Sequence, residues 1–245
     1  ENIISTFDEI YRSNFQNQQF ASPAAKEVHQ YAKALIEGFD LVKTNGLLTN
    51  NTILQIQEVV EQNKAGFRRL PGTKLLNDQT GEVIHTPPQD YDTILNLMQN
   101  LESFINDDSM MDLDPLIKMA IIHYQFESIH PFYDGNGRTG RIILMLYLKW
   151  SGLLELPAMY LSKEININKN EYYLKLRAVT EKKEWEAWVL YILNIIEQAA
   201  NNAKKQIEEI EVLKTKMSND IKKKLPKIYS HELMESLFRL PYTTH

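Results

Sequence analysis

The segment from His130 to Arg141 concentrates residue types that bind phosphate and move protons. It reads HPFYDGNGRTGR and holds three of the nine glycines in a chain of 245 residues. Gly135-Asn136-Gly137 stands where a loop is expected to pass into a helix. Glycines allow positive φ angles, which turn several backbone N–H groups toward one point, and a helix N-terminus adds further unpaired donors. This pattern predicts a cradle for a phosphate group.

Two arginines, a carboxylate and a histidine accompany the cradle. Arg138 and Arg141 are three residues apart, so a helix places both on one face. Guanidinium groups match phosphate oxygens, and one cradle with two arginines indicates more than one phosphate group. Asp134 beside phosphates requires a bridging cation, and Mg²⁺ accepts one or two carboxylates together with phosphate oxygens. His130, with an ordinary pKa of about 6.5, suits a general base that takes a proton from a hydroxyl group.

Each of these residue types also has an ordinary structural role. A histidine before proline is usually a loop histidine, Gly-Asn-Gly is usually a tight turn, and two neighbouring arginines usually form ion pairs on a solvated face. Phe132 is expected in the core under either interpretation, and His123 in its apolar helix is expected there too. The conjunction of base, metal ligand, cradle and arginine pair within twelve residues favours catalysis.

The remaining sequence predicts an almost entirely α-helical chain with one inserted hairpin. Ser22-Pro23 and Asp114-Pro115 are typical helix starts, and apolar residues follow them at helical spacing. The segment LIKMAIIHYQFESI is apolar on most sides, which predicts a central helix. Residues 66–88 break the helical pattern. Two short runs around an Asp-Gln-Thr-Gly turn predict a hairpin there.

Three further helices are expected after the cradle. The first spans about residues 137–151 and carries the apolar run IILMLYL, and the second covers about residues 168–181. A long helix begins at Glu184, with Trp185 and Trp188 in its buried stripe. Beyond Ala203 this helix becomes highly charged, which indicates a projecting or partner-facing segment.

The composition excludes several classes of site. The net charge is −5, which does not favour a nonspecific grip on nucleic acid. The sequence has no cysteine, so disulfides, thiolate zinc sites and thiol nucleophiles are excluded, and a reducing cytoplasmic location fits. No run approaches the roughly 18 apolar residues that span a bilayer, so we expect a soluble protein without membrane contact. Because the sequence begins at Glu1 and shows no signal peptide, we interpret it as a fragment.

Residues 130–141 resemble the signature of the Fic (filamentation induced by cAMP) family, His-x-Phe-x-Asp/Glu-Gly-Asn-Gly-Arg-x-x-Arg, at every fixed position. The segment TGEVIHTPP is similar to the flap hairpin of that family, and IKMAIIHYQFESIHPF to its central helix. The resemblance covers roughly residues 1–200. It implies an all-α, Fic-type helical bundle with one inserted β-hairpin flap. It also implies a protein adenylyltransferase, which transfers AMP from ATP to a Ser, Thr or Tyr hydroxyl group of a protein.

The resemblance also implies a role for each residue of the motif. His130 would deprotonate the target hydroxyl for attack on the α-phosphorus, and Asp134 would hold Mg²⁺ on the α- and β-phosphates. Asn136 would help to fix the α-phosphate, the cradle and Arg138 would hold the α- and β-phosphates, and Arg141 would reach the γ-phosphate. The expected nucleotide-binding set is Gly135, Asn136, Gly137, Arg138, Gly140 and Arg141.

Two other segments are expected to act on the same site. The flap would bind an extended segment of the target protein through backbone pairing. Glu1-Asn2 resembles the end of the inhibitory pattern Ser/Thr-x-x-x-Glu-Gly/Asn of the family. Glu1 would pair with Arg141 and hinder productive binding of ATP. The expected flap residues are Leu75, Leu76, Val83, Ile84, His85 and Thr86.

We expect three regions along the chain: an inhibitory helix region at 1–20, a catalytic domain at 21–200, and a charged helix with a partial appended module at 201–245. The final segment, YSHELMESLFRLPYTTH, could be the first helix of a winged-helix module. Alternatives for the same site are removal of AMP from a modified protein and use of another nucleotide donor. An alternative of another class is a DNA-associated regulatory or binding module. Two questions stay open: which protein is the target, which could be the chain itself, and whether the chain forms a homodimer.

Overall fold

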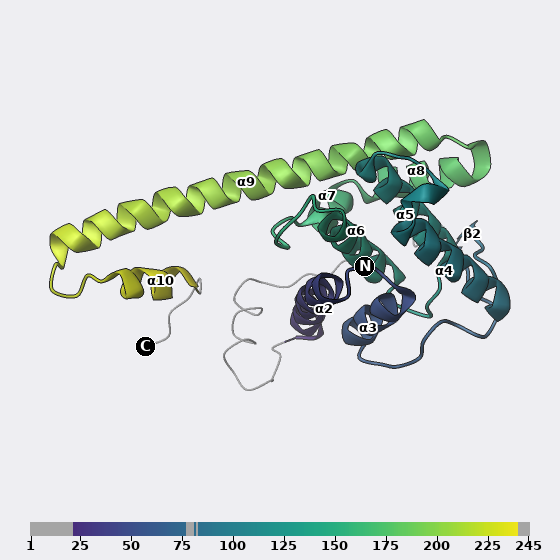
Figure 1. The fold of residues 1–245 in the computed structure, drawn as a ribbon, viewed down its shortest axis with the longest axis horizontal. Helices are drawn as coiled ribbons and strands as arrows, with labels where there is room; N and C mark the ends of the chain where they lie inside the picture. Colours follow the sequence, from purple (N-terminus) through teal and green to yellow (C-terminus); the bar gives the residue numbers. More distant parts are fainter. Residues whose placement is uncertain (1–21, 77–80, 82, 240–245) are drawn as a thin grey trace. The chain divides into compact units, whose positions relative to one another are not determined.

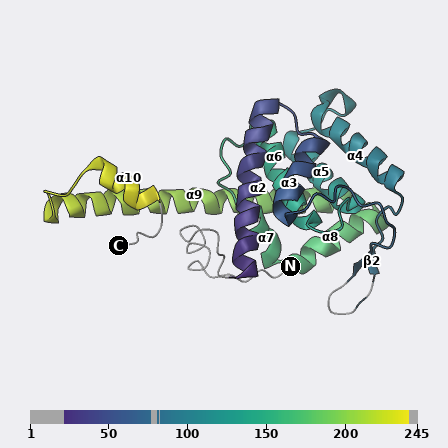
Figure 2. The ribbon, with the colours of Figure 1, turned by 90° about the horizontal axis from the view of Figure 1, so that it is seen from below.

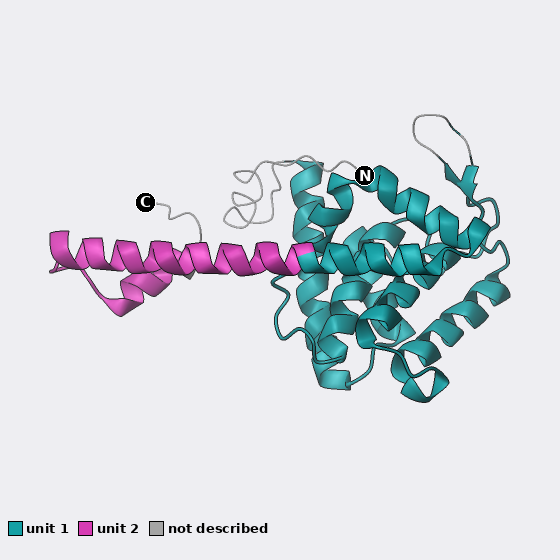
Figure 3. Ribbon diagram, turned by 90° about the horizontal axis from the view of Figure 1, so that it is seen from above, with its two compact units in different colours: residues 1–197 teal, residues 198–245 magenta. Residues whose placement is uncertain are grey.

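The computed structural model describes residues 22–76, 81 and 83–239. Within these ranges the regular structure is helical apart from one two-stranded hairpin, which confirms the predicted all-α fold with an inserted hairpin (Figure 1). The chain divides into two compact units, residues 1–197 and 198–245 (Figure 3). The motif and the hairpin both belong to the first unit.

Helices α2 (Pro23–Asn45) and α3 (Asn50–Glu61) pack against each other, and both contact α6 (Asn136–Trp150). The side chain of Ser22 caps α2, as its sequence predicts, and Gly46 ends this helix in the left-handed conformation with a φ of 67°. The pair brings two glutamates close to the start of α6.

The predicted hairpin is present and short. Strand β1 (Leu75–Leu76) pairs antiparallel with β2 (Val83–His85). The side chain of Gln89 holds the base of the hairpin, because its Nε2 donates to the carbonyl of Thr73 at 3.0 Å while its Oε1 accepts from the N–H of Gly72 at 2.6 Å. Figure 2 shows β2 at the margin of the helical bundle.

Helix α5 (Pro115–Ile129) packs on α6 and on α4 (Tyr91–Asn106). The motif begins at His130, directly after α5, and ends within the first turns of α6. The predicted central position of α5 is confirmed, because polar and apolar side chains alike are buried along it. The apolar run of α6, residues 142–148, is buried throughout, also as predicted.

After α6 the chain forms α7 (Leu161–Ile167), α8 (Lys169–Lys182) and α9 (Trp185–Lys224). Trp188 of α9 is fully buried, and its indole N–H donates to the carbonyl of Ala120 at 2.8 Å. The prediction that Trp185 is also a core residue is wrong, because its side chain is 38% exposed. Trp185 is the first residue of α9, and its ring packs edge-on against one neighbour, Tyr124, at 4.7 Å between ring centroids.

The second unit contains the rest of α9 and helix α10 (His231–Arg239), which lies within the final segment that was predicted to be helical. The hydroxyl of Ser230 caps α10 by accepting from the N–H of Leu233 at 3.0 Å. None of the described helices is long and apolar enough to cross a membrane.

Candidate active site

The motif begins with a backbone reversal at His130. The N–H of His130 donates to the carbonyl of Phe126 at 3.0 Å, and the residue then adopts the left-handed conformation with φ 49° and ψ 59°. For a residue with a side chain, this conformation costs roughly 1–2 kcal/mol. Phe132 is fully buried, as predicted, and packs on Phe67 at 5.3 Å between ring centroids. The ring of Phe132 therefore anchors the loop that carries His130.

Asn136 shapes the loop from within. Its Oδ1 accepts from the N–H of Phe132 and its Nδ2 donates to the carbonyl of Phe132, both at 2.9 Å, and the residue is 3% exposed. The amide group closes a small ring that fixes the path of residues 132–136. Its predicted contact with an α-phosphate stays a prediction.

The predicted cradle lies at the start of α6. Gly135 is the N-cap with a φ of 78°, a conformation that favours glycine, and no side chain in the described ranges caps the helix here. Helix N-termini with such unpaired N–H groups bind anions in many proteins, and the contact of this one with phosphate stays a prediction. Asp134 lies at the rim with its side chain 68% exposed, and its Oδ1 accepts from the N–H of Gly135 at 2.7 Å.

The guanidinium of Arg141 lies beside Gly137, in the first turn of α6. Its Nη1 lies 3.2 Å from the position that a Cβ atom at Gly137 would occupy. Its Nε donates to Oγ of Ser162 in α7 at 2.9 Å, and the Ser162 hydroxyl in turn donates to the Tyr31 hydroxyl at 3.2 Å. Sequence analysis did not identify Ser162 or Tyr31 as parts of the site. No spacing pattern could have found them. Ser162 lies 21 residues after Arg141, and Tyr31 lies 131 residues before Ser162.

Arg138 contacts different elements from Arg141. Its guanidinium forms ion pairs with Glu27 of α2 and, at 2.6 Å, with Glu61 of α3, and Oδ1 of Asp134 lies 3.8 Å away. The side chain of Arg138 is 8% exposed. The Glu61 carboxylate also fills the space where a Cβ at Gly135 would lie, so only glycine fits there. Arg138 thus joins α2, α3 and α6, and its predicted contact with phosphates stays a prediction.

Two polar residues of α5, Glu127 and His123, are buried next to α6. Glu127 is 7% exposed, and burial raises the pKa of its carboxyl group to about 7, against the opposing charge of Arg141. Its carboxyl group occupies the space above Gly140, where a side chain would collide with it. His123 is fully buried, which confirms its predicted core position. Its Nε2 is 3.0 Å from the Tyr172 hydroxyl, and burial lowers its pKa to about 3.

The imidazole of His130 is neutral at physiological pH. Burial, followed by the charge of Arg68 and the neighbouring His85, lowers its pKa to about 4, while Asp134 acts in the opposite direction. A general base must be unprotonated before it acts, so this environment keeps His130 in the required state. His85, a predicted flap residue, faces α5 and has its Nε2 2.9 Å from the carbonyl of Ser128.

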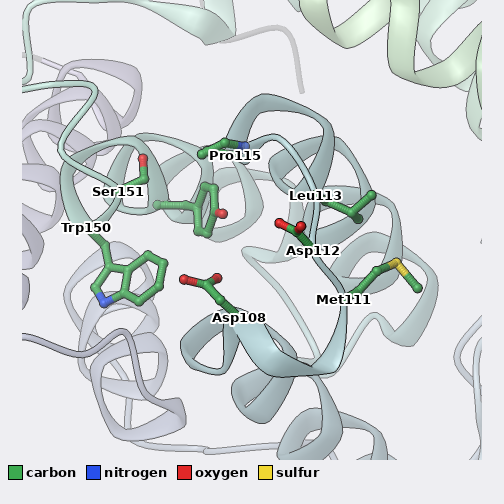
Figure 4. Close-up of a pocket in the computed structure, with 8 residues that line it drawn as sticks. Asp108, Met111, Asp112, Leu113, Pro115, Trp150 and Ser151 are labelled. Atoms are coloured by element: carbon green, nitrogen blue, oxygen red, sulfur yellow. The ribbon is translucent and has the colours of Figure 1, made fainter.

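A cavity of about 360 Å³ lies at the end of α6 away from the motif (Figure 4). The carboxylates of Asp108 and Asp112 line it together with Trp150, so its charge does not suit a phosphate. Asp107 accepts from the N–H of Ser109 in the turn after α4. Asp114 caps α5, as its sequence predicts, by accepting from the N–H of Leu116. Over the described ranges, no group of three or more His, Cys, Asp or Glu side chains is placed to hold a metal ion.

Comparison with known proteins shows which family the motif segment is similar to. Residues 47–148 match the model of the Fic/DOC family, a span that includes the whole motif. Over this span the chain is similar to proteins of the Fic/DOC family. Residues 213–245 match a model described as protein adenylyltransferase SoFic-like, C-terminal domain.

Two curated relatives of this chain are named protein adenylyltransferases. Protein adenylyltransferase fic-1 of Caenorhabditis briggsae is 31% identical over 140 residues, which are 57% of this chain and 25% of the relative. Protein adenylyltransferase Fic of Drosophila yakuba is 30% identical over 151 residues, 60% of this chain and 29% of the relative. The chain therefore spans less than a third of the length of these relatives.

Solved structures show the same fold. A Fic family protein from Desulfovibrio desulfuricans G20 matches with a TM-score of 0.66 and 21% identity, over 96% of this chain and 73% of that one. Fic-1 from Caenorhabditis elegans matches with a TM-score of 0.63 and 23% identity, over 85% of this chain and 60% of that one.

Proposed function

We propose that this chain is a protein adenylyltransferase that transfers AMP from ATP to a Ser, Thr or Tyr hydroxyl group of a protein. The observation that carries the proposal is the arrangement of His130 in the loop before the N-terminus of α6, which no side chain in the described ranges caps, with the guanidinium of Arg141 beside Gly137 in the first turn. The names of the curated relatives support the same activity.

Under this proposal, the target oxygen forms a bond to the α-phosphorus while the bond between the α-phosphorus and the bridging oxygen to the β-phosphate breaks. Pyrophosphate leaves, and His130 takes the hydroxyl proton. The first-turn N–H groups of α6 hold the triphosphate, with Arg141 beside Gly137 at its far end. Positioning and fixed positive charge supply most of the acceleration in such a transfer.

Arg138 has a different part in this scheme. Because Glu27 and Glu61 already pair with its guanidinium, any contact with the α- or β-phosphate requires exchange of at least one carboxylate. We assign the main phosphate contacts to the cradle and to Arg141. We keep Arg138 as a secondary contact.

Mg²⁺ enters the proposal together with ATP, as part of the substrate. Asp134 offers one carboxylate with a side chain that is 68% exposed, at the rim of the cradle. Magnesium bound to a nucleotide needs only one or two protein carboxylates beside the phosphate oxygens, so the residue fits this role.

The hairpin is the proposed docking site for the target segment. Leu76 and Val83 are 50% and 43% exposed, so they can receive side chains of an extended peptide. His85 is the exception among the predicted flap residues, because its ring is bonded to α5. The target, which could be a second copy of this chain, is defined only as a protein with an accessible hydroxyl group.

Inhibition by Glu1 is a further part of the proposal, and this residue lies outside the described ranges. A carboxylate on Arg141 would compete with the γ-phosphate for the same guanidinium. We also propose that residues 201–245 begin an appended module, which the match of residues 213–245 supports. A winged helix there and a cytoplasmic location stay predictions.

Labelled ATP identifies the transferred group. The protein is incubated with a cell lysate, Mg²⁺ and ATP that carries ³²P at either the α- or the γ-position. Because kinases of the lysate transfer the γ-phosphate on their own, only label above that of lysate incubated without the protein is counted. We expect such added label from the α-labelled nucleotide alone. Label from the γ-position would identify phosphate transfer instead and would overturn the proposed function.

A further inference from the structure

Arg68 is a fully buried cation next to the motif, and no feature of the sequence identified it. It lies between α3 and the hairpin, and its exposed fraction is 0%. A buried guanidinium is stable only where acceptors surround it. The acceptors of Arg68 show what this residue does.

Arg68 binds the backbone around the proposed base. Its Nε donates to the carbonyl of His130 at 2.8 Å, and its Nη2 donates to the carbonyl of Ile129 at 3.3 Å. Its own backbone N–H donates to the carbonyl of Pro131 at 2.8 Å. Three successive carbonyls, from residues 129 to 131, therefore accept from one residue.

These bonds stabilise an unfavourable backbone conformation. The last carbonyls of a helix have no partner within the helix, and a cation there interacts favourably with the helix dipole. Arg68 supplies both the donors and the charge at the end of α5. Because His130 is left-handed and not a glycine, its φ and ψ depend on such outside contacts. Those angles set the direction of the imidazole.

The same guanidinium reaches the base of the hairpin. Its Nη2 also donates to the carbonyl of Pro88, shortly after β2. His85 of β2 contacts the carbonyl of Ser128, one residue before Ile129. The hairpin and the end of α5 are thus joined at two neighbouring points, and Arg68 provides one of them.

We propose that Arg68 is a positioning residue that fixes the backbone of His130 and couples the base of the hairpin to it. The proposal rests on the proposed function where it takes His130 as the base. The charged and titratable groups that face His130 are Arg68, His85 of β2 and Asp134 of the cradle loop. Removal of Arg68 should therefore change the proton affinity of the imidazole as well as its orientation.

The test is an NMR titration of the His130 ring in the wild type, Arg68→Met and Arg68→Lys. In Arg68→Met, the midpoint should rise from about 4 toward the ordinary value near 6.5, because a positive charge is lost and water gains access. Lys118→Met is the matched control, since Lys118 is also a buried cation, 1% exposed, but pairs with Asp108 away from the motif. This control should leave the midpoint unchanged.

Arg68→Lys keeps the charge and loses the planar fork, so it separates the two effects. Its midpoint should stay near that of the wild type, while kcat for AMP transfer should fall by about ten- to a hundredfold with little change in KM for ATP. The proposal is overturned by an unchanged midpoint in folded Arg68→Met. If Arg68→Met does not fold, a wild-type kcat in Arg68→Lys overturns it.

The titration needs no activity, so the two proposals can fail separately. A shifted midpoint in a protein that transfers no AMP would support the coupling of Arg68 to His130 while contradicting the proposed function. If the wild type transfers AMP, and neither the His130 midpoint nor kcat changes in the Arg68 variants, the proposed function is supported and the role of Arg68 is contradicted.

Discussion

Nε of Arg141 donates a hydrogen bond of 2.9 Å to Oγ of Ser162, which lies on a different helix. The contact holds the guanidinium beside Gly137 in the first turn of α6. A preoriented guanidinium loses less conformational freedom when it forms a bidentate contact with phosphate. Ser162 is 4% exposed, so the bond is shielded from water.

Ser162→Ala should therefore weaken the binding of ATP. Hydrogen bonds to charged groups contribute about 1.5–3 kcal/mol, so the KM for ATP should rise by about tenfold or more, with a smaller effect on kcat. Tyr31→Phe is the control, because it removes the hydroxyl beyond Ser162 and leaves the Arg141 contact in place. Steady-state kinetics with varied ATP measures both. An unchanged KM in Ser162→Ala would show that Arg141 does not contact the nucleotide through this geometry.

Substitution of Arg138 should mainly lower the free energy of unfolding, because its guanidinium joins α2, α3 and α6. Removing one partner of a buried ion pair leaves uncompensated charge and costs about 3–5 kcal/mol, so Arg138→Met should lower the free energy of unfolding by at least about 3 kcal/mol. Arg177→Met is the comparison, since its pair with Glu181 is exposed and should contribute below about 1 kcal/mol. Urea unfolding measures the two changes. Equal losses would contradict the anchoring role of Arg138.

Glu127 should make stability depend on pH. Its pKa is about 7 in the folded protein and 4.5 ordinarily, so the folded state retains a proton that the unfolded state releases. The resulting stabilisation is complete below pH 4.5 and is lost as the pH rises through 7, by up to about 3 kcal/mol. Glu127→Gln should become more stable relative to the wild type between pH 5 and pH 8.

His123 and His130 act in the opposite sense, because their pKa values are lowered and their contribution is lost as the pH falls below 6.5. Both remain in the Glu127→Gln variant, so the difference between variant and wild type isolates Glu127. Urea titrations at pH 5 and 8, with the exposed Glu155→Gln as a reference, measure it. A difference that does not change with pH would show that Glu127 is ionised at both values.

The hairpin should select targets without affecting the chemistry. Leu76→Asp places a charge on an exposed apolar position of the hairpin and should reduce the labelling of lysate proteins several-fold through lost docking. Leu156→Asp alters an equally apolar residue, 71% exposed, in the segment between α6 and α7. Quantified labelling from α-³²P-labelled ATP compares them. Equal labelling by both variants would remove the hairpin from target binding.

Helix positions were predictable wherever the signal was local. Ser22 and Asp114 accept hydrogen bonds from the first turns of their helices, and the Gly-Asn-Gly sequence does mark the start of α6. Helix α7 was not predicted, because it has seven residues and no side-chain cap. Trp185 was misassigned because a periodic stripe does not reveal that its first member lies at a helix end.

Only those residues of the candidate site that are close together in the sequence could be predicted. Every residue of the motif lies within twelve positions, so its chemistry could be inferred from types and spacing. The residues that hold the motif come from other elements: Arg68 from the segment before the hairpin and Ser162 from α7. A guanidinium that binds three backbone carbonyls has no sequence pattern, because backbone acceptors are the same in every residue. Only the folded chain brings such partners together.

The most direct test of the account is AMP transfer by the wild type, Glu1→Gly and His130→Ala, with His231→Ala as a control because its side chain is 74% exposed in α10. Label from α-³²P-labelled ATP on protein is followed over time. We predict slow labelling by the wild type and His231→Ala, faster labelling by Glu1→Gly, and loss of about a hundredfold or more in His130→Ala. Equal labelling by His130→Ala and the wild type would contradict the assignment of His130 as the base, and with it the central claim.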